Sequence, residues 1–244
     1  MIQIKRVSKS ITDLGINDID KIHFEYLFKG INKIDTGYLK SCSENESLSN
    51  VSEATFQSCL FCYWKIILDS NKNKDYVISV CQYKYLHDFK IGKTERAAPD
   101  LVLHRSGDQE RTYQFFNEGK RPQMFACEIK MIQRIRQDSK NLLRDICKLK
   151  YFVFDADEYI RFEYGIFILG LGYIQDIIDI FKKRSYILLN NKKRFSVRSL
   201  HGLINAQEAN KHKILCIALP PEGIVECMWL EDIIVEALKK VSIR

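Results

Sequence analysis

The fold of this chain is decided by PDLVLH at residues 99–104 and MFACEIK at residues 124–130. Both stretches are apolar runs typical of strands, and each carries charged residues at one end. Since side chains alternate faces along a strand, Glu128 and Lys130 are expected on one face and Ile129 on the other. If the two strands pair, Asp100 lies close enough to Glu128 for both to share a divalent cation.

The tripeptide Glu128-Ile129-Lys130 differs from other acid-x-Lys tripeptides of this chain in the residues that precede it. The same spacing occurs in DFK at residues 88–90, EGK at 118–120 and DSK at 138–140. Only Glu128-Ile129-Lys130 follows an apolar run and has an earlier strand headed by Pro99-Asp100. The simpler alternative is a surface Glu/Lys pair, which would contribute under about 1 kcal/mol to stability.

Through Pro99, Asp100, Glu128 and Lys130 the chain resembles the PD-(D/E)XK nuclease superfamily, whose fold is called restriction-endonuclease-like. The supporting pattern extends over residues 52–220. The resemblance implies that Asp100 and Glu128 bind Mg²⁺, with Mn²⁺ as a substitute, and that the carbonyl of Ile129 completes the inner shell. It also implies that Lys130 orients or activates the attacking water and offsets charge that develops on the phosphate.

Two further residues are candidates for the same site. Many members of the superfamily carry an extra metal-linked glutamate on the first helix, and Glu53 holds a similar place here. The alternative is that Glu53 only complements the helix dipole, since Ser52 is expected to cap the helix and Glu53 to lie in its first turn. Gln133, three residues after Lys130, is expected to assist the site, as glutamines in this region do in some members.

The remaining patterns predict an α/β fold, with a restriction-endonuclease-like core in which helices flank a mixed central β-sheet. Residues 51–244 are expected to form this nuclease-like domain, and residues 1–50 a helical extension packed on it, with Ile19, Ile22, Tyr26 and Leu27 on one face. Helical periodicity and apolar runs predict the other elements. Helices are expected at 52–69, 139–152, 173–183 and 231–241, and strands at 75–85, 100–104, 124–130, 165–173, 213–219 and 225–229.

Basic residues after Lys130 are candidates for contacts with phosphates. Arg134 and Arg136 precede the helix expected at 139–152, and Lys140, Arg144 and Lys148 recur on it at every fourth residue. A solvated helix face is the alternative, because charge runs usually form one. The net charge of +7 is compatible with nucleic acid, although acidic substrates or anionic lipid headgroups would explain it equally well.

Several other classes of protein are disfavoured by the sequence. The eight cysteines include only one C-x-x-C pair, Cys59 and Cys62, so no zinc site is completed, and the other six thiols are expected to be reduced and buried. The N-terminus lacks the apolar core of a signal peptide, and the longest apolar run is short of the roughly 20 residues that span a membrane. We therefore expect a cytoplasmic protein without a membrane partner.

The expected function is that of a metal-dependent nuclease, most simply a DNA endonuclease. DNA is preferred over RNA through the resemblance alone, because no base-reading motif is present. Two alternatives remain: a non-catalytic module that binds nucleic acid or protein through the same fold, and a metal-dependent enzyme acting on another phosphate ester. A homodimer would suit cleavage of both strands, although nothing in the sequence requires one.

Overall fold

The computed structural model describes eleven segments of the chain. These are residues 14–16, 18–44, 49–72, 75–80, 99–105, 123–137, 139–155, 161–183, 186–188, 194–196 and 212–239. Residues 106–122, between the two strand stretches that carry Asp100 and Glu128, lie outside these segments. Within these segments, no helix is both long and apolar enough to cross a membrane.

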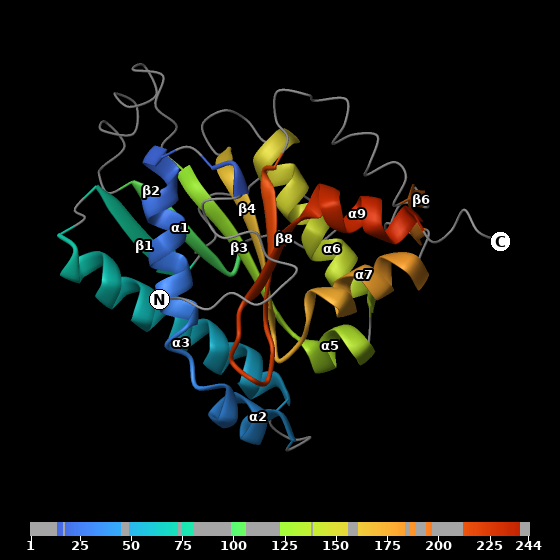
Figure 1. The fold of residues 1–244 in the computed structure, drawn as a ribbon, viewed down its shortest axis with the longest axis horizontal. Coiled ribbons are helices and arrows are strands. Elements are labelled where there is room, and N and C mark those ends of the chain that lie inside the picture. The colour runs from blue at the N-terminus through green and yellow to red at the C-terminus, as the bar shows by residue number, and fades with distance from the viewer. Residues whose placement is uncertain are drawn as a thin grey trace.

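A mixed six-stranded sheet forms the centre of the molecule (Figure 1). The first three strands along the sheet are antiparallel, the next two run parallel to the third, and the last is antiparallel again. In spatial order they are β1 (Tyr76–Val80), β2 (Leu101–Arg105), β3 (Gln123–Met131), β4 (Phe162–Gly170), β7 (Ile214–Leu219) and β8 (Glu226–Trp229). A separate hairpin consists of β5 (Tyr186–Leu188) and β6 (Arg194–Ser196).

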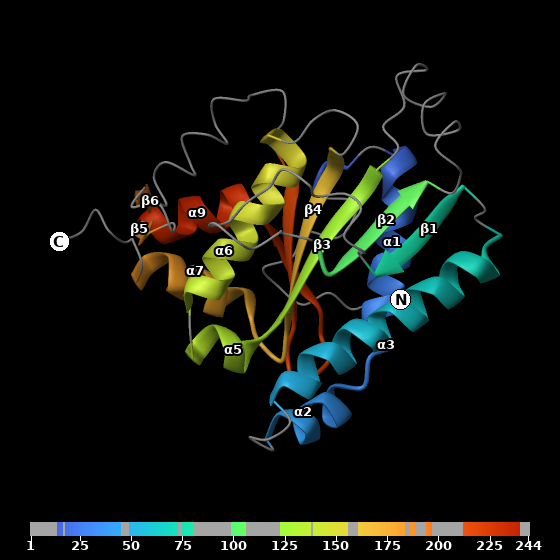
Figure 2. The ribbon, with the colours of Figure 1, turned by 180° about the vertical axis from the view of Figure 1, so that it is seen from behind.

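Helices flank the sheet, so the prediction of an α/β fold with a mixed central sheet is confirmed. Helix α1 covers one face and α6 the other, as the two opposite views show (Figures 1 and 2). Helix α3 packs along α1 and against β1 and β3, while α7 and α9 pack on each other beside β7. The helices are α1 (Asp18–Ile31), α2 (Thr36–Glu44), α3 (Ser49–Ser70), α5 (Ile132–Gln137), α6 (Ser139–Lys150), α7 (Ile174–Lys183) and α9 (Leu230–Lys239).

Element types agree with the sequence patterns more closely than element ends do. Helix α3 begins at Ser49, so Ser52 is inside the helix and is not its N-cap, and Glu53 lies beyond the first turn. Strand β4 ends at Gly170 instead of Tyr173, because Leu171 adopts a positive φ of 56° that ends the extended backbone. Helix α6 is followed by the π-helix η4 (Tyr151–Asp155), which the apolar spacing did not predict.

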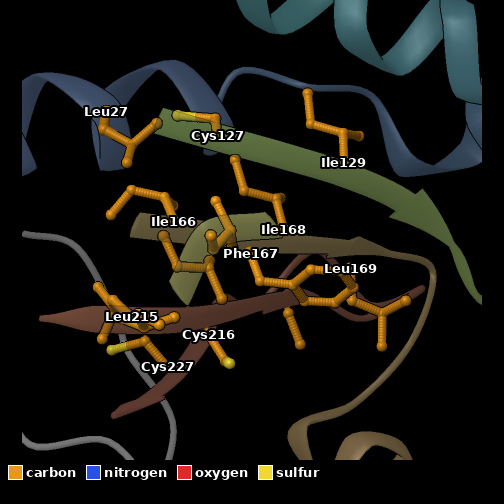
Figure 3. Close-up of a cluster of buried hydrophobic side chains, with 14 of the residues drawn as sticks. Leu27, Cys127, Ile129, Ile166, Phe167, Ile168, Leu169, Leu215, Cys216 and Cys227 are labelled. Carbon is orange, nitrogen blue, oxygen red and sulfur yellow. The ribbon is translucent and has the colours of Figure 1, made fainter. Parts of the chain in front are cut away.

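The centre of the core is apolar on both faces of β4, where every residue from Tyr164 to Gly170 is buried. Parallel strands covered on both sides are continuously apolar for this reason. Figure 3 shows side chains of β4 and β7 interleaving with Leu27 of α1 and with Cys127 and Ile129 of β3. Among the described cysteines, Cys127, Cys216 and Cys227 are buried thiols in this core as expected, whereas Cys147 is half-buried and Cys62 is exposed.

Helix α1 contributes to the same core through a face that differs from the predicted one. Ile22 is 42% exposed, so it does not belong to the buried face, although Tyr26 and Leu27 do. Phe24 is completely buried, and its ring lies 4.7 Å from that of Phe125 and 5.0 Å from that of Tyr164. Further links are hydrogen bonds from the Tyr164 hydroxyl to Asp20 and from Trp229 Nε1 to the carbonyl of Leu14.

Truncation of Phe24 tests whether the N-terminal helix is an energetic part of the sheet core. We expect Phe24→Ala to lower the free energy of unfolding by about 3–5 kcal/mol, because it empties a site enclosed by aromatic rings. Ile22→Ala, two residues earlier on the exposed side of the same helix, should change it by under about 1 kcal/mol. Urea denaturation of both variants measures the difference, and equal small effects would show that α1 contributes little to the core.

Candidate functional site

Asp100 immediately precedes β2 and is held against β3 by two backbone hydrogen bonds. Its amide donates to the carbonyl of Cys127 at 2.8 Å, and its Oδ2 accepts from the amide of Ile129 at 2.7 Å. The pairing of Leu101 with Cys127 continues this register along the strands. Asp100 therefore lies beside Glu128, as expected from pairing of the two strands.

Glu128 and Lys130 leave β3 on the face opposite Ile129, as the alternation predicted. Figure 3 shows Ile129 on the same side of the strand as Cys127, within the apolar core. Glu128 is completely buried, and Lys130 keeps 16% of its side chain exposed. The Lys130 ammonium donates to Glu53 Oε1 at 2.9 Å and to the carbonyl of Ile129 at 3.1 Å. Glu53 is thus brought to the site by α3, through its contact with Lys130.

Helix α6 adds two charged side chains to the same place. The Lys148 ammonium lies 3.0 Å from Glu128 Oε2 and 2.9 Å from Asp145 Oδ1. Asp145 also lies 3.6 Å from the Lys130 ammonium through its other oxygen. We call the six residues Glu53, Asp100, Glu128, Lys130, Asp145 and Lys148 the charge cluster.

Asp145 was not predicted as a site residue, and Lys148 lies in surroundings that differ from those predicted. Lys148 was expected on an outer row with Lys140 and Arg144, but it points into the sheet and pairs with Glu128. A signal for Asp145 was present, since it follows Leu142 by three residues on a helix whose apolar positions continue at Ile146 and Leu149. An acid at that spacing faces the core and needs a buried partner.

The other predicted residues lie around the charge cluster or beyond it. Gln133 and Arg134 are half-buried at the start of α5, directly after β3. Arg136 is exposed and contacts Asp176 of α7 at 3.3 Å, so its guanidinium is engaged by protein. Arg144 is half-buried on α6, and the side chain of Lys140 lies outside the described part of the chain. Because Lys148 points towards the sheet, it does not share an outward-facing row with Arg144.

Burial dominates the electrostatics of the two strand carboxylates. It raises the pKa of Asp100 above its ordinary value, although Lys130, the Ile129 amide and Lys148 oppose the shift. Burial, together with the neighbouring Asp145, also raises the pKa of Glu128 well above its ordinary value, against the opposing effect of Lys148. Removing a carboxylate from water disfavours its charged form unless positive charge is near.

The two lysines respond in the opposite sense. Burial alone would lower the pKa of Lys130, but Asp145, Asp100 and Glu53 together raise it above its ordinary value. Lys148 behaves alike, with Glu128 and Asp145 outweighing the effect of burial on its pKa. Both ammonium groups are therefore charged at neutral pH, and they offset part of the negative charge of the neighbouring carboxylates.

Two observations bear on whether the charge cluster fits a divalent cation. With all groups ionised, four carboxylates face two ammonium groups, which leaves two negative charges uncompensated. Buried oxygens without a hydrogen-bond partner include Glu53 Oε2, Glu128 Oε1 and Asp145 Oδ2. Charge and acceptors thus fit a divalent cation. Within the described ranges, however, no set of three or more acidic, histidine or cysteine side chains is already arranged around a metal position.

Comparisons of this chain with family models, curated proteins and solved structures find no match. The chemical capacity of the charge cluster follows from its own members. Paired carboxylates can hold a hard cation, and a permanently charged lysine beside them can stabilise developing negative charge. Half-buried Gln133, whose Oε1 has no hydrogen-bond partner, offers one more oxygen at the start of α5.

Replacing Asp100 tests the cost of its buried charge. We expect Asp100→Asn to raise the free energy of unfolding at pH 7 by about 1 kcal/mol without divalent cations, because a neutral amide can still accept from the Ile129 amide. Since the folded-state pKa of Asp100 is raised, the wild type regains stability as the pH falls through that value. The gain should therefore vanish below the ordinary pKa of 3.8.

Denaturation of the two proteins across pH 3.5–8 in EDTA measures this difference. Asp69→Asn is the matched control, because it removes the same charge from an exposed pair with Lys65. It should change stability by under about 0.5 kcal/mol. Destabilisation by Asp100→Asn at pH 7 would contradict the assigned cost of burial.

Proposed function

We propose that this chain is a metal-dependent nuclease that hydrolyses nucleic-acid phosphodiester bonds, most simply a DNA endonuclease with a restriction-endonuclease-like core. One observation carries the proposal: the hydrogen bond from the Ile129 amide to Asp100 sets that carboxylate beside Glu128, with Lys130 on the same face of β3. This is the arrangement that the resemblance to the PD-(D/E)XK superfamily requires of Asp100, Glu128 and Lys130.

The order of elements around the site supports the same proposal. Helix α3 precedes an antiparallel set of three strands, and α6 then connects β3 to the parallel strand β4. The resemblance predicts this succession of a helix, three strands, a helix and a strand. Both helices send charged side chains to β3, namely Glu53 from α3 and Asp145 and Lys148 from α6.

In the proposed mechanism, Asp100 and Glu128 would hold Mg²⁺ or Mn²⁺, assisted by the Ile129 carbonyl and Glu53. A cation held there would supply Lewis-acid chemistry, namely a lower pKa of bound water and stabilisation of the leaving oxygen. The carboxylate neighbours of Lys130 raise its pKa, which favours a role for the charged ammonium group. Its role is to orient the attacking water and to offset charge that develops on the phosphate.

Nucleic acid is the proposed substrate because the chain is basic and arginines lie on the helices next to the charge cluster. The chain has a net charge of +7, and Arg134 and Arg144 lie on the two helices that follow β3. Contacts of this kind add affinity without reading sequence. DNA is preferred over RNA through the resemblance alone.

A non-catalytic module that retains the fold is the second candidate. The observation that favours it is that Lys148 and Lys130 already neutralise part of the acidic charge that a metal would use. Such a module would bind polynucleotide equally well with and without a divalent cation. Binding strength in both cases should fall with rising salt.

Cleavage assays with matched variants test the proposed reaction. Single-stranded, duplex and branched DNA are incubated with the whole chain in Mg²⁺, Mn²⁺ or EDTA. We expect metal-dependent cleavage, which Lys130→Met lowers by about 10²-fold or more, because positive charge at the reacting phosphate is lost. Lys65→Met, which removes a charge from an exposed pair on α3, should cleave as the wild type does.

Glu128→Gln separates the metal site from the fold in the same experiment. It should abolish cleavage and also the rise in melting temperature that Mn²⁺ gives the wild type, because it removes a ligand charge. Cleavage that persists in EDTA or in Glu128→Gln would exclude the proposed mechanism. If no DNA is cut and melting is insensitive to Mn²⁺, the non-catalytic module becomes the better description.

A further inference from the structure

The Lys148 ammonium occupies a position between two buried carboxylates. It lies within 3.0 Å of both Glu128 Oε2 and Asp145 Oδ1, whose side chains are 0% and 4% exposed. The other Glu128 oxygen has no hydrogen-bond partner. The most deeply buried acid of the charge cluster is thus neutralised by a lysine from another element and not by solvent.

This position conflicts with binding of a metal at the same acid. A divalent cation that reaches Glu128 approaches a carboxylate whose Oε2 already contacts an ammonium group, and like charges in a partly buried site repel strongly. Without any cation, an unpaired buried Glu128 carboxylate would be costly. A carboxylate at Glu128 therefore needs a positive partner with or without the metal. The Lys148 ammonium and a divalent cation are, however, unfavourable there together.

We propose that Lys148 is an internal counter-ion that leaves Glu128 when a divalent cation binds, and that Asp145 is the positioning residue that retains it. This inference rests on the proposed metal-dependent function. Lys148 holds the Glu128 side chain in place while the metal is absent. When the metal arrives, Lys148 loses its contact with Glu128 and keeps its contact with Asp145.

The geometry favours Asp145 as the residue that keeps Lys148. The two lie three residues apart on α6, so their pair survives any change that affects only the contact with β3. Lys148 retains 16% exposure, and its flexible four-carbon stem allows the ammonium to move while the helix stays in place. Asp145 also faces the Lys130 ammonium at 3.6 Å, and it thereby holds both lysines of the site.

Mn²⁺ affinity of the whole chain, measured by calorimetry without nucleic acid, tests this exchange. Lys148→Gln should bind Mn²⁺ about tenfold more tightly than the wild type, because the competing charge is gone while the amide can still donate to Glu128. Lys150→Gln removes the same charge from α6 about 200° around the helix, and should leave the affinity within about twofold. Tightening by Lys150→Gln equal to that by Lys148→Gln would overturn the proposal in favour of a general charge effect.

A double-mutant cycle shows whether Asp145 acts through Lys148. Asp145→Asn alone should weaken Mn²⁺ binding by about fivefold, because Glu128 is then the one carboxylate left to Lys148 among the described residues. In the Lys148→Gln background the same change should have under about twofold effect. An equal loss in both backgrounds would overturn the positioning role, since Asp145 would then act on the metal directly.

The outcomes distinguish this inference from the proposed function. A wild type that binds Mn²⁺, together with unchanged or weaker binding by Lys148→Gln, overturns the exchange alone. Absence of Mn²⁺ binding by both proteins overturns the metal site and the exchange together. If Lys148→Gln does not fold, Lys148→Arg and Asp145→Asn replace it. Lys148→Arg keeps the charge and should bind Mn²⁺ like the wild type. A tenfold change in the Mn²⁺ affinity of Lys148→Arg would contradict the proposal.

Discussion

The hydrogen bond from the Ile129 amide to the Asp100 carboxylate is the interaction on which the arrangement of the site depends. It joins the start of β2 to the middle of β3 and fixes which residues of the two strands are opposite each other. A slip of one residue would turn Glu128 and Lys130 into the apolar core and Ile129 towards α6. Because the core accepts Ile129 and rejects a charge, apolar packing and the position of the acids specify the same register.

That register places a charged side chain where the sheet is otherwise apolar. Glu128 is fully buried, and its partner strand β4 is buried from Tyr164 to Gly170. The protein offsets this cost locally, through the Lys148 ammonium, and globally, through an aromatic core that includes Phe24. A carboxylate whose pKa is raised by burial weakens the fold at neutral pH. A buried charge that weakens an otherwise apolar core is the kind of conflict expected at functional sites.

Sequence patterns predicted the six strands of the central sheet, the pairing at Asp100 and Glu128, and helix α7, because each depends on a period within one element, whereas the hairpin of β5 and β6 was not predicted. The buried residues of α7 follow the helical period, and they are Ile174, Ile177, Ile178 and Phe181. Patterns were less informative where one element meets another. Ile22 fits a helical stripe but points to solvent, and Lys148 fits a basic row but pairs with Glu128. The direction of the Lys148 side chain depends on the angle at which α6 crosses the sheet, and residue spacing within the helix does not specify that angle.

The site is assembled from the paired strands and from helices α3 and α6, and this couples its chemistry to packing. Asp100, Glu128 and Lys130 belong to paired strands and are held by the sheet, whereas Glu53 and Lys148 come from helices on which the strands exert no such control. Leu142, Ile146 and Leu149 bury the inner face of α6, so apolar packing brings Lys148 to Glu128. The dependence also runs in the other direction. If α6 were displaced, Glu128 would lose its counter-ion and Lys148 one of its partners, and this penalty adds to the lost apolar contacts. Docking of α6 and neutralisation of Glu128 are therefore coupled.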